Sequence, residues 1–205
     1  MADPIAEKLL DIAIGLAEAG SWESVRLHEV ARVAGRTLDE VRVHFREKED
    51  MTDLWFDRAD RAMLQVAQAA DFAALDTRTR LHRLIMTWLG ALAAHRRVTR
   101  QMILNKLELG HLHVQIPGLL RVSRTVQWLR EAAQRDATYG HRALEETGLT
   151  TIYLMTFFHW MYDGSPGCAS TSRFLDRLLR GAERLSHRVF GRSARVSQPA
   201  RPVQS

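Results

Sequence analysis

Residues 27–55 read LHEVARVAGRTLDEVRVHFREKEDMTDLW, and this stretch decides the fold of the N-terminal part of the chain. Gly35 occupies the position where a residue in the left-handed region would end one short helix. Thr37 and Glu40 form a capping-box pattern, which predicts a second helix starting at Leu38. A helix, a glycine-containing turn and a second helix make up the helix-turn-helix pattern, whose second helix can lie in the major groove of DNA.

The second of these helices has two distinguishable faces. Val41 and Phe45 are four positions apart, so both are expected to point toward a core. Arg42, Val43 and Arg46 then fall on the other faces, where they are free to contact a partner.

The composition is that of an ordinary globular protein, with 46% hydrophobic and 26% charged residues in a chain of 205. No apolar run approaches the ~18 residues of a membrane span, and the N-terminus MADPIAEKLL lacks the pattern of a signal peptide. The single cysteine, Cys168, excludes an internal disulfide framework. We therefore expect a cytoplasmic protein without stable membrane insertion, in which Cys168 is inert rather than a nucleophile.

Charge is unevenly distributed along the chain. Residues 1–60 hold 8 Lys or Arg and 14 Asp or Glu, a balance of −6, while residues 61–205 hold 21 and 10, a balance of +11. Phosphate neutralisation supplies much of the affinity for DNA, so this balance argues against a broad basic surface in the N-terminal part. A local patch is the alternative, because several of the acids belong to the first predicted helix. The basic residues available for it are Arg26, Arg32, Arg36, Arg42, Arg46 and Lys48.

Apolar residues recur at helical spacing through most of the chain, and strand-like alternation is almost absent. We predict an all-α protein of about nine helices, with an N-terminal three-helix unit followed by a larger helical domain. The predicted boundaries are residues 1–50 for the helix-turn-helix domain, 51–190 for the larger domain and 191–205 for a disordered tail.

Glycine residues mark the predicted helix ends within the larger domain. We expect one helix to break at Gly110, residues 111–118 to form a connector, and Gly140 and Gly148 to flank a short helix. Residues 149–162 (LTTIYLMTFFHWMY) are apolar nearly all round, which predicts a helix buried from several sides.

Recognisable catalytic motifs are missing from the sequence. It has no phosphate-binding glycine loop, dinucleotide fingerprint, CxxC or HExxH motif, so we expect neither an enzyme nor a cofactor. No metal site is predicted either, because a histidine pair without further ligands is more simply solvent-exposed. Three residue sets have a functional alternative beside their simpler structural interpretation: His111 with His113 as a metal pair, Asp163, Ser165 and His159 as a hydrolytic set, and Glu145 with Glu146 as an acid/base pair. We interpret Asp163 and Ser165 as turn and cap residues around Pro166.

The N-terminal part resembles the DNA-binding unit of TetR-family regulators. The matching features are VARVAG at 30–35, Thr37 at a helix start and HFREKEDM at 44–51. The resemblance implies a cytoplasmic homodimer that binds palindromic operator DNA through its N-terminal domain and a small apolar ligand or lipid through the larger domain. It predicts a ligand-responsive repressor. From the resemblance and the local basic patch, the expected DNA-binding residues are Arg26, Arg36, Thr37, Leu38, Arg42, His44 and Lys48, the last neutralising a phosphate.

Asp39 and Glu40 stand at the front of the predicted recognition helix, where acids repel phosphates. Glu40 is explained by the capping box, although a glutamate can also accept from a cytosine amino group.

A second resemblance covers residues 152–179, which are similar to the closing segment of the lipid-binding accessory proteins of coenzyme Q biosynthesis, relatives that keep the TetR fold. The shared features include Ile152-Tyr153, Met161 through Pro166 and Arg173-Phe174-Leu175. The alternative function is therefore a lipid or isoprenoid-quinone-precursor binding protein of ubiquinone biosynthesis that does not bind DNA. The chain after Phe190 is expected to be too short and proline-containing to supply a membrane-binding helix.

Aromatic and methionine residues of the larger domain are candidates for a ligand cavity or for plain core. The expected cavity residues are Trp88, Met102, Trp128, Met155, Phe158 and Trp160. By the TetR resemblance, the last two long helices pair with their symmetry mates. The expected dimer-interface residues are Phe157, Met161, Phe174, Leu178 and Leu185.

Overall fold

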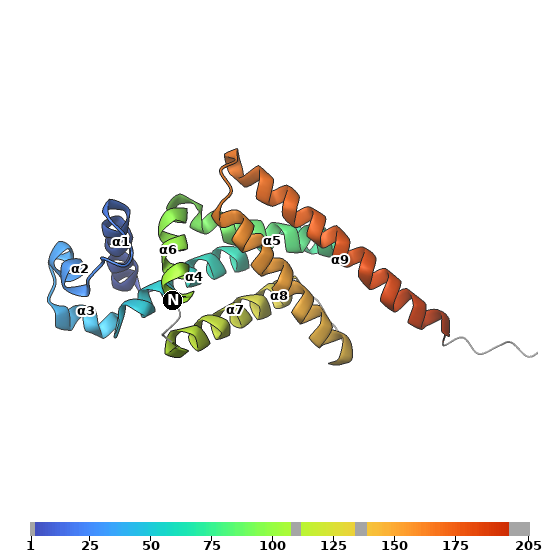
Figure 1. Ribbon diagram of the computed structural model, residues 1–205, viewed down its shortest axis with the longest axis horizontal. Helices are drawn as coiled ribbons and strands as arrows, with labels where there is room; N and C mark the ends of the chain where they lie inside the picture. Colours follow the sequence, from blue (N-terminus) through green and yellow to red (C-terminus); the bar gives the residue numbers. More distant parts are fainter. Residues whose placement is uncertain (1–2, 108–111, 134–138, 197–205) are drawn as a thin grey trace, which may run out of the picture.

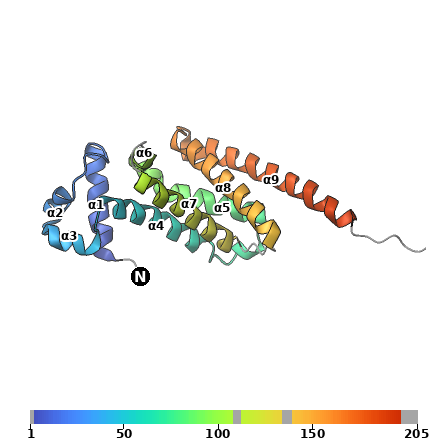
Figure 2. The same ribbon diagram turned by 60° about the horizontal axis from the view of Figure 1, so that its bottom comes forward.

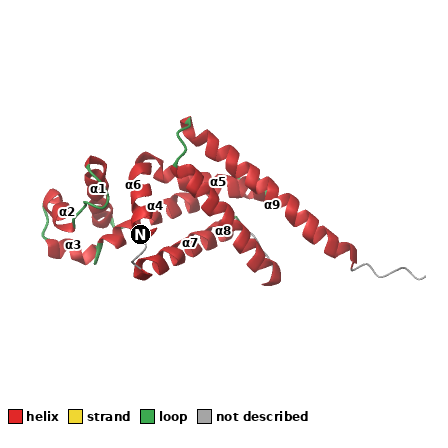
Figure 3. Ribbon diagram, viewed as in Figure 1, coloured by secondary structure: helices red, strands yellow, loops and turns green. Residues whose placement is uncertain are grey.

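The computed structural model describes residues 3–107, 112–133 and 139–196. Every regular element within these ranges is a helix, joined by short loops (Figure 3), which confirms the all-α prediction. We call α1–α3 the head and α4–α9 the body. The helices are α1 (Pro4–Ala19), α2 (Leu27–Ala34), α3 (Leu38–His44), α4 (Lys48–Val66), α5 (Thr77–Leu92), α6 (Arg96–Leu107), α7 (Leu112–Ala132), α8 (Tyr139–Met161) and α9 (Ala169–Val196), with 3₁₀ turns at Phe72–Ala74, Ala93–His95 and Pro166–Cys168.

The head lies at one end of an elongated molecule, and α4 leads from it into the body (Figures 1 and 2). At the opposite end α9 extends past the other helices. Residues on α9 from Arg180 to Ser186 are all exposed, in agreement with this projection.

The local signals of the head act as predicted. Gly35 ends α2 in the left-handed conformation, with φ 66° and ψ 34°. The Thr37 side chain accepts from the Glu40 N–H, and the Glu40 carboxylate accepts from the Thr37 N–H at 2.8 Å. Both halves of the capping box are therefore formed, and α3 begins at Leu38.

The core of the body is built around Trp88 on α5. Its ring stacks on Phe56 of α4 with centroids 5.8 Å apart and meets the edges of Tyr153 and Phe157 of α8. The Trp88 indole N–H donates to the buried carboxylate of Asp60 at 2.7 Å, which satisfies the polar atom of this large ring. Aromatic side chains from three helices thus hold α4, α5 and α8 together.

Two predicted interruptions in the body are wrong. Residues 112–118 belong to α7, and Gly148 lies inside α8, whose start at Tyr139 agrees with the boundary expected near Gly140. Glycine in a helix interior costs only about 1 kcal/mol relative to alanine, so tertiary packing over a long helix can override it. The helix predicted over 149–162 is the C-terminal part of α8.

At the C-terminal end, α9 continues to Val196, beyond the predicted start of a tail at residue 191. Residues 197–205 lie outside the described part of the chain. Among the helices that are described, none combines the length and the apolar character needed to cross a membrane.

Candidate nucleic-acid interface and its link to the body

One face of α3 is open to solvent and the opposite face is buried. Val41 and the following Phe45 are almost fully covered, as predicted. In contrast, Leu38 is 53% exposed and Val43 is 76% exposed, although both are apolar. Arg42 is exposed on the same side. Two uncovered apolar side chains beside an arginine on a short helix mark a surface that is suited to contact with another molecule.

The acids of α3 are both paired with arginines. Asp39 Oδ1 accepts from Nε and Nη2 of Arg42, each at 3.2 Å. Arg36 Nη1 lies 3.1 Å from Glu40 Oε1. Hydrogen bonds from the Thr37 backbone and side chain, helped by Arg36, lower the pKa of Glu40. The capping interpretation of Glu40 is confirmed.

Three of the predicted DNA-binding residues are engaged inside the head. His44 Nδ1 lies 2.5 Å from Asp3 Oδ2, and only 15% of the His44 side chain is exposed. Lys48 Nζ donates to the carbonyl oxygens of Trp22 and Glu23, each at 3.2 Å, and burial lowers its pKa. Arg26 Nη1 donates to the Glu23 carbonyl oxygen at 2.6 Å. Of the three, only His44 lies on α3, and its pairing with Asp3 leaves little of it exposed, so the open face of α3 consists of other residues.

Acids of α1 are bound by arginines of α4. Arg58 Nε lies 2.5 Å from Glu7 Oε2, and Arg58 Nη1 lies 2.6 Å from Asp11 Oδ1. Arg61 also pairs with Glu7. Arginines of the body therefore pair with much of the negative charge of α1, and this pairing does not involve α3.

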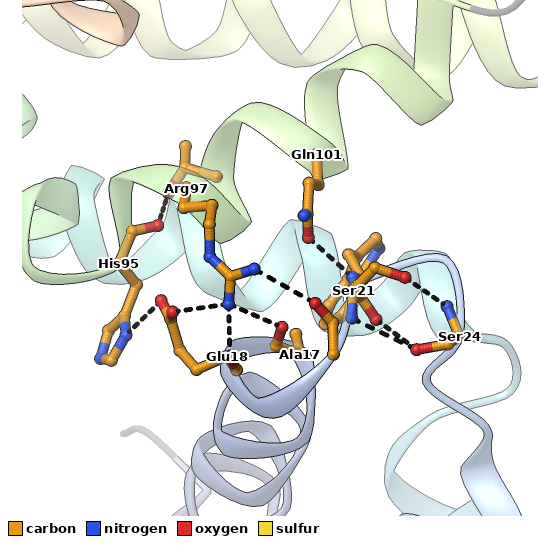
Figure 4. Close-up of polar contacts among 10 residues, drawn as sticks. Ala17, Glu18, Ser21, Ser24, His95, Arg97 and Gln101 are labelled. Carbon is orange, nitrogen blue, oxygen red and sulfur yellow. Dashed lines mark hydrogen bonds and ion pairs between the residues drawn. The ribbon is translucent and has the colours of Figure 1, made fainter.

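Helix α6 holds the C-terminal end of α1 (Figure 4). Arg97 donates to the carbonyl oxygens of Gly20 and Ala17, at 3.2 and 3.3 Å, and also to that of Glu18. Its Nη2 lies 3.1 Å from the Glu18 carboxylate as well. The last carbonyls of a helix have no intrahelical partners, so Arg97 caps α1 from another part of the chain.

Two further contacts extend this link between head and body. Gln101 Oε1 accepts from the Trp22 N–H at 2.8 Å, and His95 Nδ1 lies 3.2 Å from Glu18 Oε1 (Figure 4). Burial raises the pKa of Glu18, but the bonds from Arg97 and His95 outweigh it, and the net shift is downward. Lys48 of α4 binds the carbonyl oxygen of Trp22, and Gln101 of α6 binds its N–H, so both helices hold the segment after α1.

The neighbouring Arg96 connects α6 to the corner between α8 and α9. Its guanidinium donates to the Asp163 carbonyl oxygen, lies 2.9 Å from Cys168 Sγ, and sits 5.0 Å from the centre of the Trp160 ring. The first turn of α6 therefore contacts the head through Arg97 and the α8–α9 corner through Arg96. No short-range pattern in the sequence distinguishes these two arginines from the many others.

Asp163 organises the α8–α9 corner. Its carboxylate accepts from the Ser165 N–H, the Thr171 N–H and the Thr171 hydroxyl, at 2.8, 2.8 and 2.6 Å. Burial works to raise the pKa of Asp163, but these hydrogen bonds prevail and hold it far below its usual value. The turn-and-cap interpretation is confirmed. His159 bonds Ser170 rather than Ser165, so the structure does not assemble the hydrolytic set.

The six predicted cavity residues do not line one space. Trp88, Met102 and Trp160 are buried in the core, whereas Trp128, Met155 and Phe158 are exposed. On α8 the reason is helical periodicity, because Met155 and Phe158 fall on the face opposite to Trp160.

The predicted dimer-interface residues also fall into a buried group and a group at the surface. Phe157 and Met161 are buried within the chain's own core and offer no surface to a partner. Phe174 and Leu178 are half-buried, and Leu185 is 62% exposed. Among the residues of α8 whose burial is described, Met155 and Phe158 are the large exposed apolar side chains, and Tyr162, directly after the helix, is 69% exposed.

The side chains of His111, His113, Glu145 and Glu146 lie outside the described part of the structure. Among the residues that it does describe, no three His, Cys, Asp or Glu side chains form a group suited to a metal ion.

A three-helix head whose third helix has a face open to solvent, attached to a larger helical body, is the arrangement of a helix-turn-helix protein. The chain is similar to a TetR transcriptional regulator from Nitrosomonas europaea ATCC 19718, with 52% identity, 88% of this chain and 99% of that chain covered, and a TM-score of 0.80. It therefore belongs to the TetR family of transcriptional regulators.

Other comparisons agree on the fold. A TetR regulator from Rhodococcus sp. RHA1 is 18% identical, with 85% and 92% of the two chains covered and a TM-score of 0.64. The fatty acid degradation regulator FadR from Bacillus halodurans is also 18% identical, with 87% and 96% covered and a TM-score of 0.52. The COQ9 family model matches residues 139–186, which correspond to α8 and most of α9. No curated protein sequence matches the chain.

Proposed function

We propose that this TetR-family regulator binds palindromic operator DNA as a homodimer and represses transcription until a small apolar ligand releases it. The DNA-binding part of this proposal rests on the open face of α3. Arginine donates to guanine in the major groove, and apolar side chains such as Leu38 and Val43 suit the methyl group of thymine. Nothing in the described part of the head covers these side chains.

The apolar surface that α8 and α9 leave open supports the proposed dimer. Met155 and Phe158 on α8 and Tyr162 directly after it recur at helical spacing, and Leu185 is exposed on the projecting part of α9. Covering this surface with a second copy would remove it from water and place two heads in one particle. Two recognition helices then reach successive major grooves, roughly 34–36 Å apart.

The contacts of α6 offer a route for ligand control. Arg97 and Gln101 tie α6 to the end of α1, so a ligand that shifts α6 within the body changes the orientation of the head. Ligand binding need only favour the geometry in which the two recognition helices no longer match the operator.

The direct test is selection of bound fragments from genomic DNA by the purified protein, at about 0.1 M salt so that close phosphate contacts survive screening. We expect enrichment of an inverted repeat. Arg42→Ala should lower operator affinity roughly tenfold or more, since a good base contact is worth about 1–3 kcal/mol, while dimerisation stays unchanged. Lys8→Ala, which removes a charge from an exposed position on α1, is the matched control. Folded, dimeric protein that enriches no sequence would refute the proposal.

The COQ9 match supports a second candidate, a lipid or isoprenoid-quinone-precursor carrier that keeps only the fold. It covers α8 and α9 but not the head. Mass spectrometry of the purified protein tests it: a stoichiometric co-extracted isoprenoid together with no operator would favour the carrier.

The contact between Gln101 of α6 and Trp22 of the head can be tested separately. In Gln101→Ala the Trp22 N–H loses its acceptor, and its hydrogen exchange is expected to accelerate roughly tenfold, because one hydrogen bond is worth about 1 kcal/mol. Operator affinity should fall as the head becomes less firmly oriented. Arg100→Ala is the control for the exchange at Trp22, since Arg100 lies on α6 but contacts Tyr162, with its Cζ 5.5 Å from the ring centre. Unchanged exchange at Trp22 in Gln101→Ala would show that the Gln101 bond does not hold the segment after α1.

A further inference from the structure

Asp39 lies on the open face of α3, and the capping box does not explain why an acid stands there. Glu40 is occupied by Thr37 and Arg36, so its role is local. Asp39 instead projects into solvent beside Arg42, and the two side chains are 81% and 74% exposed. On a helix that approaches phosphates, an uncompensated carboxylate weakens binding, so the contacts of Asp39 matter.

The geometry of the pair leaves one edge of the Arg42 guanidinium available. Asp39 takes Nε–H and one N–H of Nη2, which form one edge of the planar fork. The other edge, made by Nη1 and the second N–H of Nη2, points away from the carboxylate. Within the described residues no other group bonds this guanidinium. Two parallel donors on one edge match O6 and N7 of guanine in the major groove.

We propose that Asp39 is a positioning residue, which holds Arg42 so that its free edge reads a guanine in each operator half-site. This rests on the proposed DNA binding and names the base that the interface recognises. An arginine on a flexible side chain can reach a phosphate or several bases, and the bond to Asp39 favours one direction among these. The carboxylate also lowers affinity for arbitrary phosphates, so the pair favours discrimination over binding strength.

The removal of Asp39 has a signature that a merely structural role would not produce. Asp39→Ala removes the orienting acceptor and one negative charge, so binding to non-operator DNA should strengthen while the preference for guanine falls, roughly three- to tenfold. Asp39→Asn keeps an oxygen acceptor and should retain part of that preference. Glu23→Gln removes one charge at an exposed position of the head away from α3, and should leave the preference unchanged.

The experiment is selection from a randomised duplex pool, followed by competition binding with single-base variants of the selected site. Arg42→Ala first identifies the guanine position, as the one whose preference it abolishes. The proposal requires Asp39→Ala to weaken preference at that same position. If Asp39→Ala instead relaxes a different position occupied by cytosine, Asp39 reads a base itself and the positioning role is overturned. If the full profile is unchanged, the proposal also fails. If wild-type protein selects no sequence, the proposed function fails, and this result is distinct from the other two.

Discussion

Asp163→Ala is expected to lower the free energy of unfolding by about 3 kcal/mol, because it leaves two backbone N–H groups and a buried hydroxyl without their acceptor. The Thr171 partner is fully buried, so water does not readily replace the lost bonds. Urea denaturation measures the difference. Asp176→Ala on α9 is the control, since its pair with Arg180 lies at the surface and should contribute no more than about 0.5 kcal/mol. An equal loss in both variants would contradict the role given to Asp163.

The same carboxylate makes the stability difference depend on pH. The pKa of Asp163 in the folded protein is held below the ordinary value of 3.8. Above pH 3.8 the carboxylate therefore makes its full contribution to the free energy of unfolding. Below it the unfolded state gains a proton that the folded state does not, so the contribution declines on acidification. The difference in the free energy of unfolding between wild type and Asp163→Ala should therefore be constant near neutrality and should decrease below about pH 4. A gap that widens on acidification would contradict this assignment.

Phe158→Glu is expected to convert the proposed dimer into a monomer, since it places a charge within the exposed apolar surface of α8. A single head engages one half-site only, so operator affinity should fall by roughly 10²- to 10⁴-fold with the loss of bivalent binding. Sedimentation velocity and operator binding measure the two effects. The fold should survive, because Phe158 is substantially exposed in the single chain.

Gln65→Glu, at an exposed position on α4, controls for the added charge. A dimeric Phe158→Glu protein would show that the interface lies elsewhere. Monomeric protein with unchanged operator affinity would show that recognition does not need two heads.

Local signals made the head predictable. Gly35, Thr37 and Glu40 act within a few residues of one another, and Val41 and Phe45 are separated by about one helical turn, so their roles follow from backbone geometry alone. The family followed from the same stretch. In the body, glycine and proline were weaker guides, and α7 and α8 run through the positions where breaks were expected.

The sequence alone thus determined the all-α class, the helix-turn-helix and the open face of α3, because each depends on neighbours close in the chain. Tertiary structure alone decided that Lys48 and His44 turn into the head, and that Phe157 and Met161 serve the core. It also decided that the Gln101 side chain accepts from the Trp22 N–H, 79 positions away. Arg96 likewise binds the α8–α9 corner, while Arg97 binds the end of α1. Helical periodicity says which residues share a face, but only the packing of helices distant in sequence determines what that face meets.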